Sequence, residues 1–256
     1  MLVAALDTAT LTLSCALVDL DPAGGPVRVR CERTEHAAAK PAPGRTGGHG
    51  ARLPSALTDL LTAEGLTLPD VEGYAIGIGP GSFTGLRIGL ATWKGLAYAN
   101  RRPIAGASSL AALALGAAPA APEGALLVPL LDAKKGEVYA GFYRVAGGAV
   151  EAVAPDAALA PGALLERLAT LPGGAGALAL GEGLAAYAET LEGRLTRLAG
   201  APVAPPAGAI AALAAPALLS RPYDAQALFA LEPHYVRASE AELKFPHGLG
   251  PGAQKP

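Results

Sequence analysis

The chain has 256 residues, of which 51% are hydrophobic and 16% charged, a composition that supports a sizeable core and excludes disorder along the whole chain. Its 20 basic and 22 acidic residues give a net charge of −2, so it lacks the basic surplus of proteins that bind nucleic acids unaided. Because Cys15 and Cys31 are the only cysteines, a disulfide scaffold is not expected. The sequence shows neither a secretory segment nor an apolar run long enough to span a bilayer, so we expect a cytoplasmic protein without membrane association.

Three strands are predicted at the start of the chain. The short apolar run Leu2–Leu6 ends at Asp7 and is typical of a buried strand. Residues Leu11–Leu20 are rich in β-forming types and end in a turn cluster. Along Val27–Glu35, apolar and charged residues alternate, which predicts a half-exposed strand.

A Pro- and Gly-rich loop at residues 37–48 separates these strands from a predicted helix. Pro54 is expected in the first turn of that helix, where its missing N–H costs nothing. The leucines of the helix share one stripe: Leu53, Leu57, Leu60 and Leu61. A fourth strand is predicted at Gly73–Ile78, and it leads through a glycine-rich loop into a helix that ends near Asn100.

A second block of elements begins near Pro103. The predicted strands are Leu126–Leu131, Val138–Val145 and Ala177–Leu180, and the predicted helices are Ala163–Leu171 and Leu184–Leu191. Two blocks that each start with strands and continue into helices indicate a two-lobed α/β protein. We expect one domain at residues 1–104 carrying the partner-binding helices, a second at 105–245 whose C-terminal helix can return to the first, and a flexible tail at 246–256.

The loop within Gly77–Gly89 lies between a strand and a helix, the usual layout for holding an anion on backbone N–H groups. A Walker loop requires Lys where Leu86 stands, and the dinucleotide fingerprint requires Gly where Ser82 stands. A nucleophile elbow requires Gly at the positions of Pro80 and Thr84. The plain alternative is a turn in which Ser82 or Thr84 caps the helix.

The helix after this loop has two distinct faces. One is an ordinary core stripe: Leu86, Leu90, Trp93 and Ala97. The other is narrow enough for a second helix, from this chain or a partner, to approach closely: Gly85, Gly89, Thr92 and Leu96. Arg87, Lys94 and Arg101 recur every seven residues along one edge, which is either a solvated face or a rim toward a partner or RNA.

These motifs resemble the TsaB (YeaZ) family. Its signature is matched by Gly79–Gly89 (GPGSFTGLRIG), and its first strand pair by Leu6–Thr10. Its second-lobe hairpin, a late glycine motif and its ending are similar to Asp132–Tyr139, Gly181–Gly183 and Pro233–Arg237. The eleven-residue signature is specific, whereas the shorter motifs are weak when taken alone.

The resemblance implies an actin/Hsp70-like (ASKHA) fold, each lobe a mixed sheet with flanking helices. It implies a non-catalytic subunit that pairs with a TsaD-like catalytic subunit and works with a TsaE-like ATPase to make N6-threonylcarbamoyladenosine in tRNA. The chain then reaches tRNA indirectly through the complex, and it can pair with itself as a homodimer. The expected partner interface comprises Leu53, Leu57, Gly85, Arg87, Gly89, Thr92 and Leu96.

Neither a catalytic residue nor a metal site is expected. Catalytic relatives hold a metal with two histidines one helical turn apart, but here Lys40 follows His36 and Leu53 follows His49 at that spacing. The phosphate-binding hairpins of this fold are poor in glycine here, so no cofactor is expected, and ATP or ADP could bind only at the complex interface. Their expected relics are Asp7, Thr8, Gly79, Gly81, Ser82, Asp132 and Gly136, the two aspartates fixing turns by side-chain hydrogen bonds.

Two other functions stay open. An active ATPase or kinase of the same fold would bind and turn over nucleotide alone. A glycoprotease-like peptidase of the M22 type would need a nucleophile, and no Ser, His and acid set is evident from the order of residues.

Overall fold

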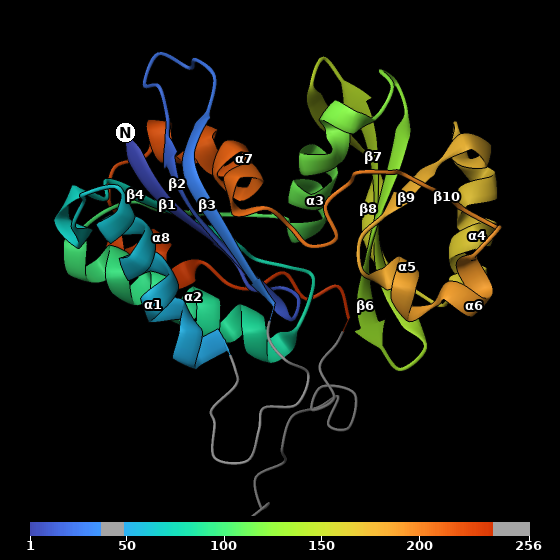
Figure 1. The fold of residues 1–256 in the computed structure, drawn as a ribbon, viewed down its shortest axis with the longest axis horizontal. Helices are drawn as coiled ribbons and strands as arrows, with labels where there is room; N and C mark the ends of the chain where they lie inside the picture. The colour runs from blue at the N-terminus through green and yellow to red at the C-terminus, as the bar shows by residue number, and fades with distance from the viewer. Residues whose placement is uncertain (37–48, 238–256) are drawn as a thin grey trace, which may run out of the picture.

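The computed structural model describes residues 1–36 and 49–237 and contains two five-stranded sheets (Figure 1). The first sheet has the order β3-β2-β1-β4-β5 and consists of β1 (Leu2–Asp7), β2 (Thr12–Asp19), β3 (Arg28–His36), β4 (Gly73–Gly77) and β5 (Ile104–Ala107). The second has the order β10-β9-β6-β7-β8 and consists of β6 (Leu126–Lys134), β7 (Glu137–Ala146), β8 (Ala149–Leu159), β9 (Leu178–Leu180) and β10 (Thr196–Arg197).

The helices connect and cover these strands. They are α1 (His49–Ala63), α2 (Phe83–Asn100), α3 (Ser109–Ala117), α4 (Pro161–Thr170), α5 (Gly183–Ala186), α6 (Ala188–Leu191), α7 (Ala207–Ser220) and α8 (Ala225–Ala230). Short 3-10 turns lie at Leu68–Asp70, Ala118–Ala120 and Gly174–Gly176. Among the described residues, no helix is both long and apolar enough to cross a membrane.

The two sheets share one topology. In the first, β1, β2 and β3 are antiparallel neighbours, whereas β4 and β5 continue on the other side of β1 in parallel. In the second, β6, β7 and β8 are antiparallel, and β9 and β10 continue in parallel. Each lobe is therefore a mixed sheet, as the resemblance implied.

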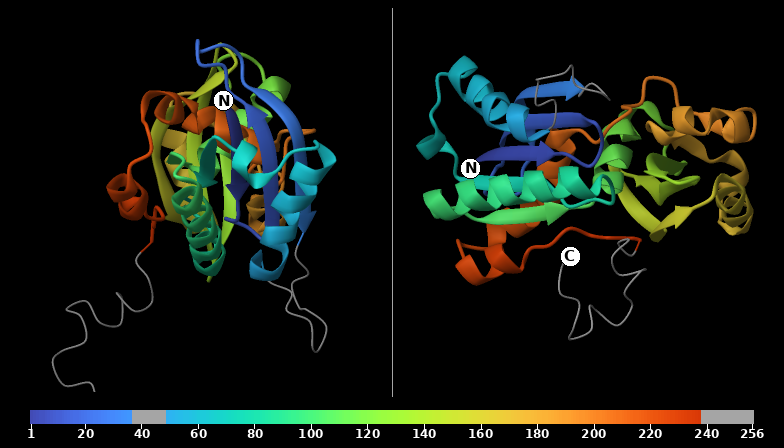
Figure 2. Two further views of the ribbon diagram at one scale, coloured as in Figure 1. Left: turned by 90° about the vertical axis from the view of Figure 1, so that its left-hand side faces the viewer. Right: turned by 90° about the horizontal axis from the view of Figure 1, so that it is seen from below.

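Helices and sheets alternate in layers (Figures 1 and 2). Helices α1 and α2 pack on one face of the first sheet, and α7 packs on its other face. Helix α3 lies between the two sheets and contacts β6, β7 and β8 as well as α7. The outer face of the second sheet is covered by α4, α5 and α6. Helix α2 is anchored to its sheet by Trp93, which is fully buried and donates through Nε1 to the carbonyl oxygen of Ala4 at 3.0 Å.

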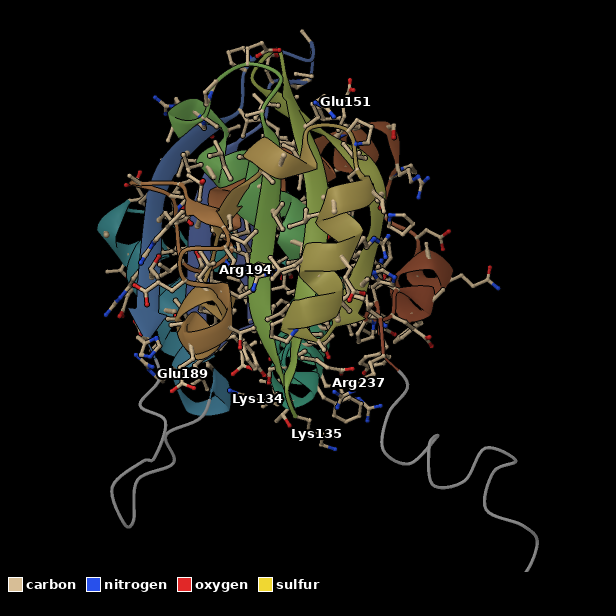
Figure 3. All side chains as sticks on the ribbon, turned by 90° about the vertical axis from the view of Figure 1, so that its right-hand side faces the viewer. Lys134, Lys135, Glu151, Glu189, Arg194 and Arg237 are labelled. Carbon is tan, nitrogen blue, oxygen red and sulfur yellow. The ribbon has the colours of Figure 1, made fainter. Side chains whose placement is uncertain are left out.

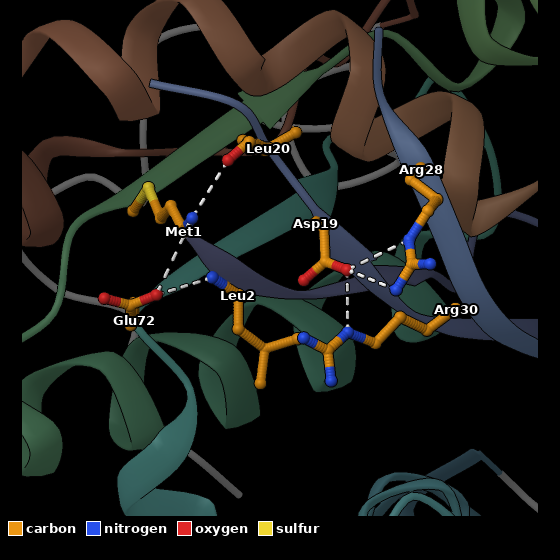
Figure 4. A network of polar contacts seen from close by, with 7 residues as sticks. All are labelled: Met1, Leu2, Asp19, Leu20, Arg28, Arg30 and Glu72. Atoms are coloured by element: carbon orange, nitrogen blue, oxygen red, sulfur yellow. Dashed lines mark hydrogen bonds and ion pairs between the residues drawn. The ribbon is translucent and has the colours of Figure 1, made fainter. Parts of the chain in front are cut away.

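A network of polar contacts joins the ends of the first strands (Figure 4). The Met1 amino group donates to the carbonyl oxygen of Leu20 at 2.9 Å, and the backbone N–H of Leu2 donates to Glu72 Oε2 at 2.7 Å. At the neighbouring strand ends, Asp19 Oδ2 accepts from Arg28 at 3.1 Å and from Arg30 at 2.8 Å. The contacts of Met1 and Leu2 hold the start of β1 beside the end of β2 and the residue before β4, and those of Asp19 tie β2 to β3.

The structure confirms the first three strands, the helix that ends at Asn100 and the hairpin around Lys134–Gly136, but corrects two expected helices. Helix α1 begins at His49, so Pro54 lies inside it rather than in its first turn. The helix expected at Leu184–Leu191 is broken at Tyr187, whose φ of −126° and ψ of 34° are not helical. The loop at residues 37–48 and the tail at 246–256 lie outside the described residues.

Apart from the two-residue β10, five elements lie outside every predicted residue range: β5, α3, β8, α7 and α8. Their sequences are rich in alanine, and α7 contains Pro216 while β8 contains Pro155, so neither periodicity nor propensity marks them. The domain boundary expected at residue 104 falls at the start of β5, a strand of the first sheet. Helix α7, from the expected second domain, packs on that same sheet.

Candidate functional site

The glycine-rich loop packs directly against the β1–β2 turn. The backbone N–H of Ser82 donates to the carbonyl oxygen of Ala9 at 2.6 Å. A side chain at Gly81 would collide with the backbone of Ala9, and one at Gly85 would collide with the carbonyl oxygen of Thr8. These glycines are therefore required by the close approach of two backbone segments, independently of any anion.

Helix α2 is capped within the chain. Ser82 Oγ accepts from the backbone N–H of Gly85 at 3.2 Å, so Ser82 is the N-cap residue. Of the two caps left open by the sequence, Ser82 is correct. The N–H groups of Ser82 and Gly85 thus have partners in the protein, which reduces what the loop can offer a phosphate.

Asp7 lies behind this loop with its side chain fully buried. Its Oδ1 accepts from the backbone N–H of Ala9 at 2.8 Å, and its Oδ2 accepts from the hydroxyl of Ser109 at 2.6 Å. Burial raises the pKa of Asp7 to about 6, although both hydrogen bonds act to lower it. Ser109 Oγ also accepts from the backbone N–H of Gly79 at 3.2 Å, so one hydroxyl joins β1, the glycine loop and α3.

Asp132 holds the corresponding turn of the second lobe. Its Oδ1 accepts from the backbone N–H of Lys134 at 2.7 Å, and its Oδ2 pairs with Lys134 Nζ at 2.5 Å. Burial acts to raise the pKa of Asp132, but the hydrogen bonds from Lys134 outweigh it and the pKa is lowered. Lys134, Lys135 and Gly136 have φ of 60°, 56° and 83°, so this tight turn lies in the left-handed region.

The two turns and the glycine loop face one another across a cleft between the lobes. The cleft has a volume of about 440 Å³. It is lined by Ala9, Thr10, Leu11, Gly81, Ser82, Phe83, Thr84, Asp132, Ala133, Lys134, Lys135, Tyr139, Glu182, Ala186 and Arg237. The basic lining residues lie at the same end of the second lobe: Lys134, Lys135 and Arg237 (Figure 3). Among the acidic lining residues, Glu182 has its pKa raised by burial.

Only some of the predicted phosphate-loop residues line this cleft. Gly81, Ser82 and Asp132 line the cleft. Asp7 and Thr8 are buried behind it, and Thr8 Oγ1 donates to the carbonyl oxygen of Gly85 at 2.9 Å. Gly79 and Gly136 are not among the lining residues. Both aspartates make the turn-fixing hydrogen bonds that were expected of them.

A second hollow is a groove between α1 and α2 with a volume of about 430 Å³. It is lined by Leu53, Pro54, Leu57, Thr58, Leu61, Thr62, Leu66, Thr67, Leu68, Thr92 and Leu96. Not one of these side chains is charged. Four residues of the predicted interface therefore meet at one apolar groove: Leu53, Leu57, Thr92 and Leu96.

The other three residues of the predicted interface lie elsewhere. Gly85 and Gly89 are buried against Thr8 of the β1–β2 turn, so the prediction that a second helix approaches them is corrected. Arg87 is exposed on a different side of α2, where its guanidinium lies 3.9 Å from the centre of the Phe83 ring and its Nε donates to Tyr235 Oη at 3.0 Å.

Sequence reasoning gave Ser109 no role, and it named Arg237 only as the end of a family motif and not as a residue of the site. Arg237 pairs at 2.9 Å with Glu137, the residue that follows the turn of the second-lobe hairpin. Ser109 is separated from Asp7 by 102 positions, and no local pattern reports such a contact. Within residues 1–36 and 49–237, no three His, Cys, Asp or Glu side chains are grouped to hold a metal ion.

Comparison with known proteins gives a consistent assignment. Residues 46–245 match the model of the TsaD family, described as tRNA N6-adenosine threonylcarbamoyltransferase. A protein of Escherichia coli K12 named tRNA threonylcarbamoyladenosine biosynthesis protein TsaB is 39% identical over 127 residues, covering 49% of this chain and 54% of that protein. Its namesake in Bacillus subtilis is 37% identical over 108 residues, covering 42% of this chain and 46% of that protein. The chain thus spans about half the length of these relatives.

Solved structures extend the likeness over nearly the whole chain. The structure of YeaZ from Pseudomonas aeruginosa superposes with a TM-score of 0.69 at 30% identity, covering 91% of this chain and 99% of that one. Another Pseudomonas aeruginosa structure, described as similar to peptidase YEAZ, gives a TM-score of 0.67 at 30% identity and covers 92% and 99% of the two chains.

Proposed function

The chain belongs to the TsaD family, within it to the TsaB (YeaZ) group with its two-lobed actin-like fold, and on this basis we propose that it is a non-catalytic subunit of the machinery that makes threonylcarbamoyladenosine in tRNA. Its direct partner is a TsaD-like catalytic subunit, and a TsaE-like ATPase acts with both. The chain contributes a binding surface to the complex and performs no reaction alone.

The groove between α1 and α2 carries this proposal. It is exposed, apolar and free of charged lining residues, which is the character of a protein-docking surface. Leu53 and Leu57 line it and also belong to the hydrophobic core, so this side of the groove is held in place by core packing. Thr58 and Thr62 are exposed at its edge, where a helix of a partner can lie between α1 and α2.

The turns at the expected phosphate-loop positions support a non-catalytic role. In an active nucleotide site, backbone N–H groups of the turns point toward the ligand. Here the N–H of Ser82 is held by Ala9, the N–H of Ala9 by Asp7, and the N–H of Lys134 by Asp132. The turns therefore use these donors to stabilise one another.

Reconstitution tests the proposal. Unmodified tRNA is incubated with the TsaD-like and TsaE-like proteins, threonylcarbamoyl-AMP and ATP, with or without this chain, and the modified nucleoside is measured by mass spectrometry. We expect formation of threonylcarbamoyladenosine to depend on the chain. Equal product in its absence would overturn the proposal.

An ATPase of the same fold is the second candidate, because the cleft between the lobes has three basic residues in its lining: Lys134, Lys135 and Arg237. Calorimetric titration of the isolated chain with ATP, together with a phosphate-release assay, separates the two functions. Turnover by the chain alone would favour the ATPase.

A further inference from the structure

Within the part of the chain that the structure describes, the large aromatic side chains that are exposed gather along one side of α2. Among the described residues, the large apolar side chains that are exposed include four aromatic ones, at 44% for Phe83, 53% for Tyr98, 63% for Phe229 and 40% for Tyr235. Phe83 and Tyr98 belong to α2, while Phe229 and Tyr235 belong to the segment 224–237 that lies along it (Figure 2). Isolated exposed apolar residues need no explanation, but their concentration on one strip does.

The four aromatic residues form two pairs at the two ends of α2. Phe83 and Tyr235 have ring centres 5.4 Å apart, and Tyr98 and Phe229 have ring centres 5.5 Å apart. With 1.5 Å per helical residue, Phe83 and Tyr98 are separated by about 22 Å along the axis. The pairing leaves all four rings at least two-fifths exposed, so each pair still offers surface for a ligand to stack on.

A cation accompanies each aromatic pair. The Arg87 guanidinium lies over the Phe83 ring and donates to Tyr235 Oη, and Lys94 Nζ donates to the carbonyl oxygen of Phe229 at 2.9 Å. At 100° per residue, Phe83, Arg87, Lys94 and Tyr98 fall within about 60° of the helix circumference. We call these four residues, with Phe229 and Tyr235, the aromatic strip.

The charged residues around the aromatic strip indicate what kind of partner it binds. Residues 83–102 contain four basic residues and no acidic one, and segment 224–237 adds Asp224, Glu232 and Arg237, so the two segments together carry a positive charge although the whole chain has a net charge of −2. The groove on the other side of α2 has no charged lining residue at all. Helix α2 therefore presents an uncharged apolar side toward α1 and a cationic aromatic side toward segment 224–237, which indicates two partners of different chemistry.

We propose that the aromatic strip binds unpaired nucleotides of RNA, within the tRNA substrate of the complex. Aromatic rings that stack bases and basic side chains that contact phosphates are the combination used for single-stranded nucleic acid. At about 3.4 Å per stacked nucleotide, the distance of ~22 Å accommodates a loop of about six nucleotides. The proposal deepens the proposed function and rests on it for the identity of the RNA.

Binding of fluorescent RNA to the isolated chain and to its complex with the TsaD-like protein tests the proposal. The probes are a tRNA stem–loop with an unpaired loop and a fully paired RNA duplex of equal length, followed by fluorescence anisotropy between 50 and ~200 mM KCl. We expect the stem–loop to bind more tightly than the duplex. Equal affinity for the two probes, or no binding by either form of the protein, overturns the proposal.

Variants locate the binding surface. Tyr98→Ala or Phe229→Ala is expected to weaken stem–loop binding by roughly 5- to 150-fold, the usual range for losing one stacked base. Lys94→Gln is expected to make the slope of log affinity against log salt shallower by about 0.7, the value for one phosphate contact with a single strand. Val203→Ala, exposed at 53% on another part of the surface, and Arg194→Gln, on the second lobe (Figure 3), are the matched controls and should change neither quantity.

The outcomes separate this proposal from the proposed function. Assembly with the TsaD-like protein is measured for every variant by light scattering. If the strip variants assemble normally but keep full RNA affinity, the strip proposal fails and the proposed function stands. If they lose assembly instead, the strip is a protein-docking surface and the proposal is wrong. Should the wild-type chain bind the stem–loop through the strip yet never assemble, the proposed function alone fails.

Discussion

At the scale of one residue, Asp7 is a buried carboxylate whose hydrogen bonds stabilise the fold. Its carboxylate is buried, accepts from Ala9 and Ser109, and leaves no space for any side chain at Gly77. The sequence predicts the local half of this arrangement, because an aspartate two residues before a backbone N–H commonly closes a turn. It cannot predict Ser109, since that contact depends on how α3 packs against the first sheet.

Asp7 also predicts a pH dependence. Burial raises its pKa from 3.8 to about 6, so the folded protein binds this proton more tightly than the unfolded chain. The resulting contribution to the unfolding free energy is complete below pH ~4 and is lost as pH rises through ~6, amounting to about 3 kcal/mol. Asp7→Asn removes the titrating group while keeping an acceptor for Ala9, so its unfolding free energy should fall less between pH 4 and 7 than that of the wild type.

Urea denaturation at several pH values, followed by circular dichroism, measures this difference. The comparison between wild type and Asp7→Asn cancels the contributions of all other groups. Parallel pH profiles for the two proteins would show that Asp7 titrates at an ordinary pKa in the folded state.

At the scale of one element, α2 shows what a helical projection can predict and what it cannot. The predicted core stripe of Leu86, Leu90, Trp93 and Ala97 is buried throughout. The second predicted face has two different neighbours along its length, because Gly85 and Gly89 meet the β1–β2 turn whereas Thr92 and Leu96 meet the α1 groove. A projection gives the direction in which a side chain points, but tertiary packing decides what lies there.

The glycines of α2 should respond oppositely to substitution. A side chain at Gly95 meets nothing within 4 Å, so Gly95→Ala is expected to stabilise the free chain by about 1 kcal/mol through helix propensity. A side chain at Gly89 collides with Thr8 Oγ1, which donates to Gly85, so Gly89→Ala is expected to destabilise it by about 1–3 kcal/mol. Thermal denaturation of both variants measures the two effects, and a shift in the same direction would contradict this account of the helix.

At the scale of the whole molecule, the two lobes are joined at the first residues of α3. Ser109 donates to Asp7 of the first sheet, and its neighbour Ser108 donates to Asp156 of the second sheet at 3.1 Å. Burial raises the pKa of Asp156, which also accepts from Tyr143 at 2.8 Å. Two similar blocks of elements in the sequence predict two lobes. The contacts between the lobes could not be predicted, because they depend on α3, an alanine-rich helix without a recognisable pattern.

The groove between α1 and α2 is expected to dock a TsaD-like subunit, and size-exclusion chromatography with light scattering of the co-expressed proteins tests this docking most directly. Thr62 lies in the groove, whereas Ala63 is exposed one position further along α1 and outside the groove lining. Thr62→Glu would bury an unpaired charge on docking and should weaken association at least about tenfold, while Ala63→Glu should assemble like the wild type. Failure of the wild-type chain to form a heteromer, with the TsaE-like protein and ATP present, or undiminished assembly of Thr62→Glu, would contradict this expectation.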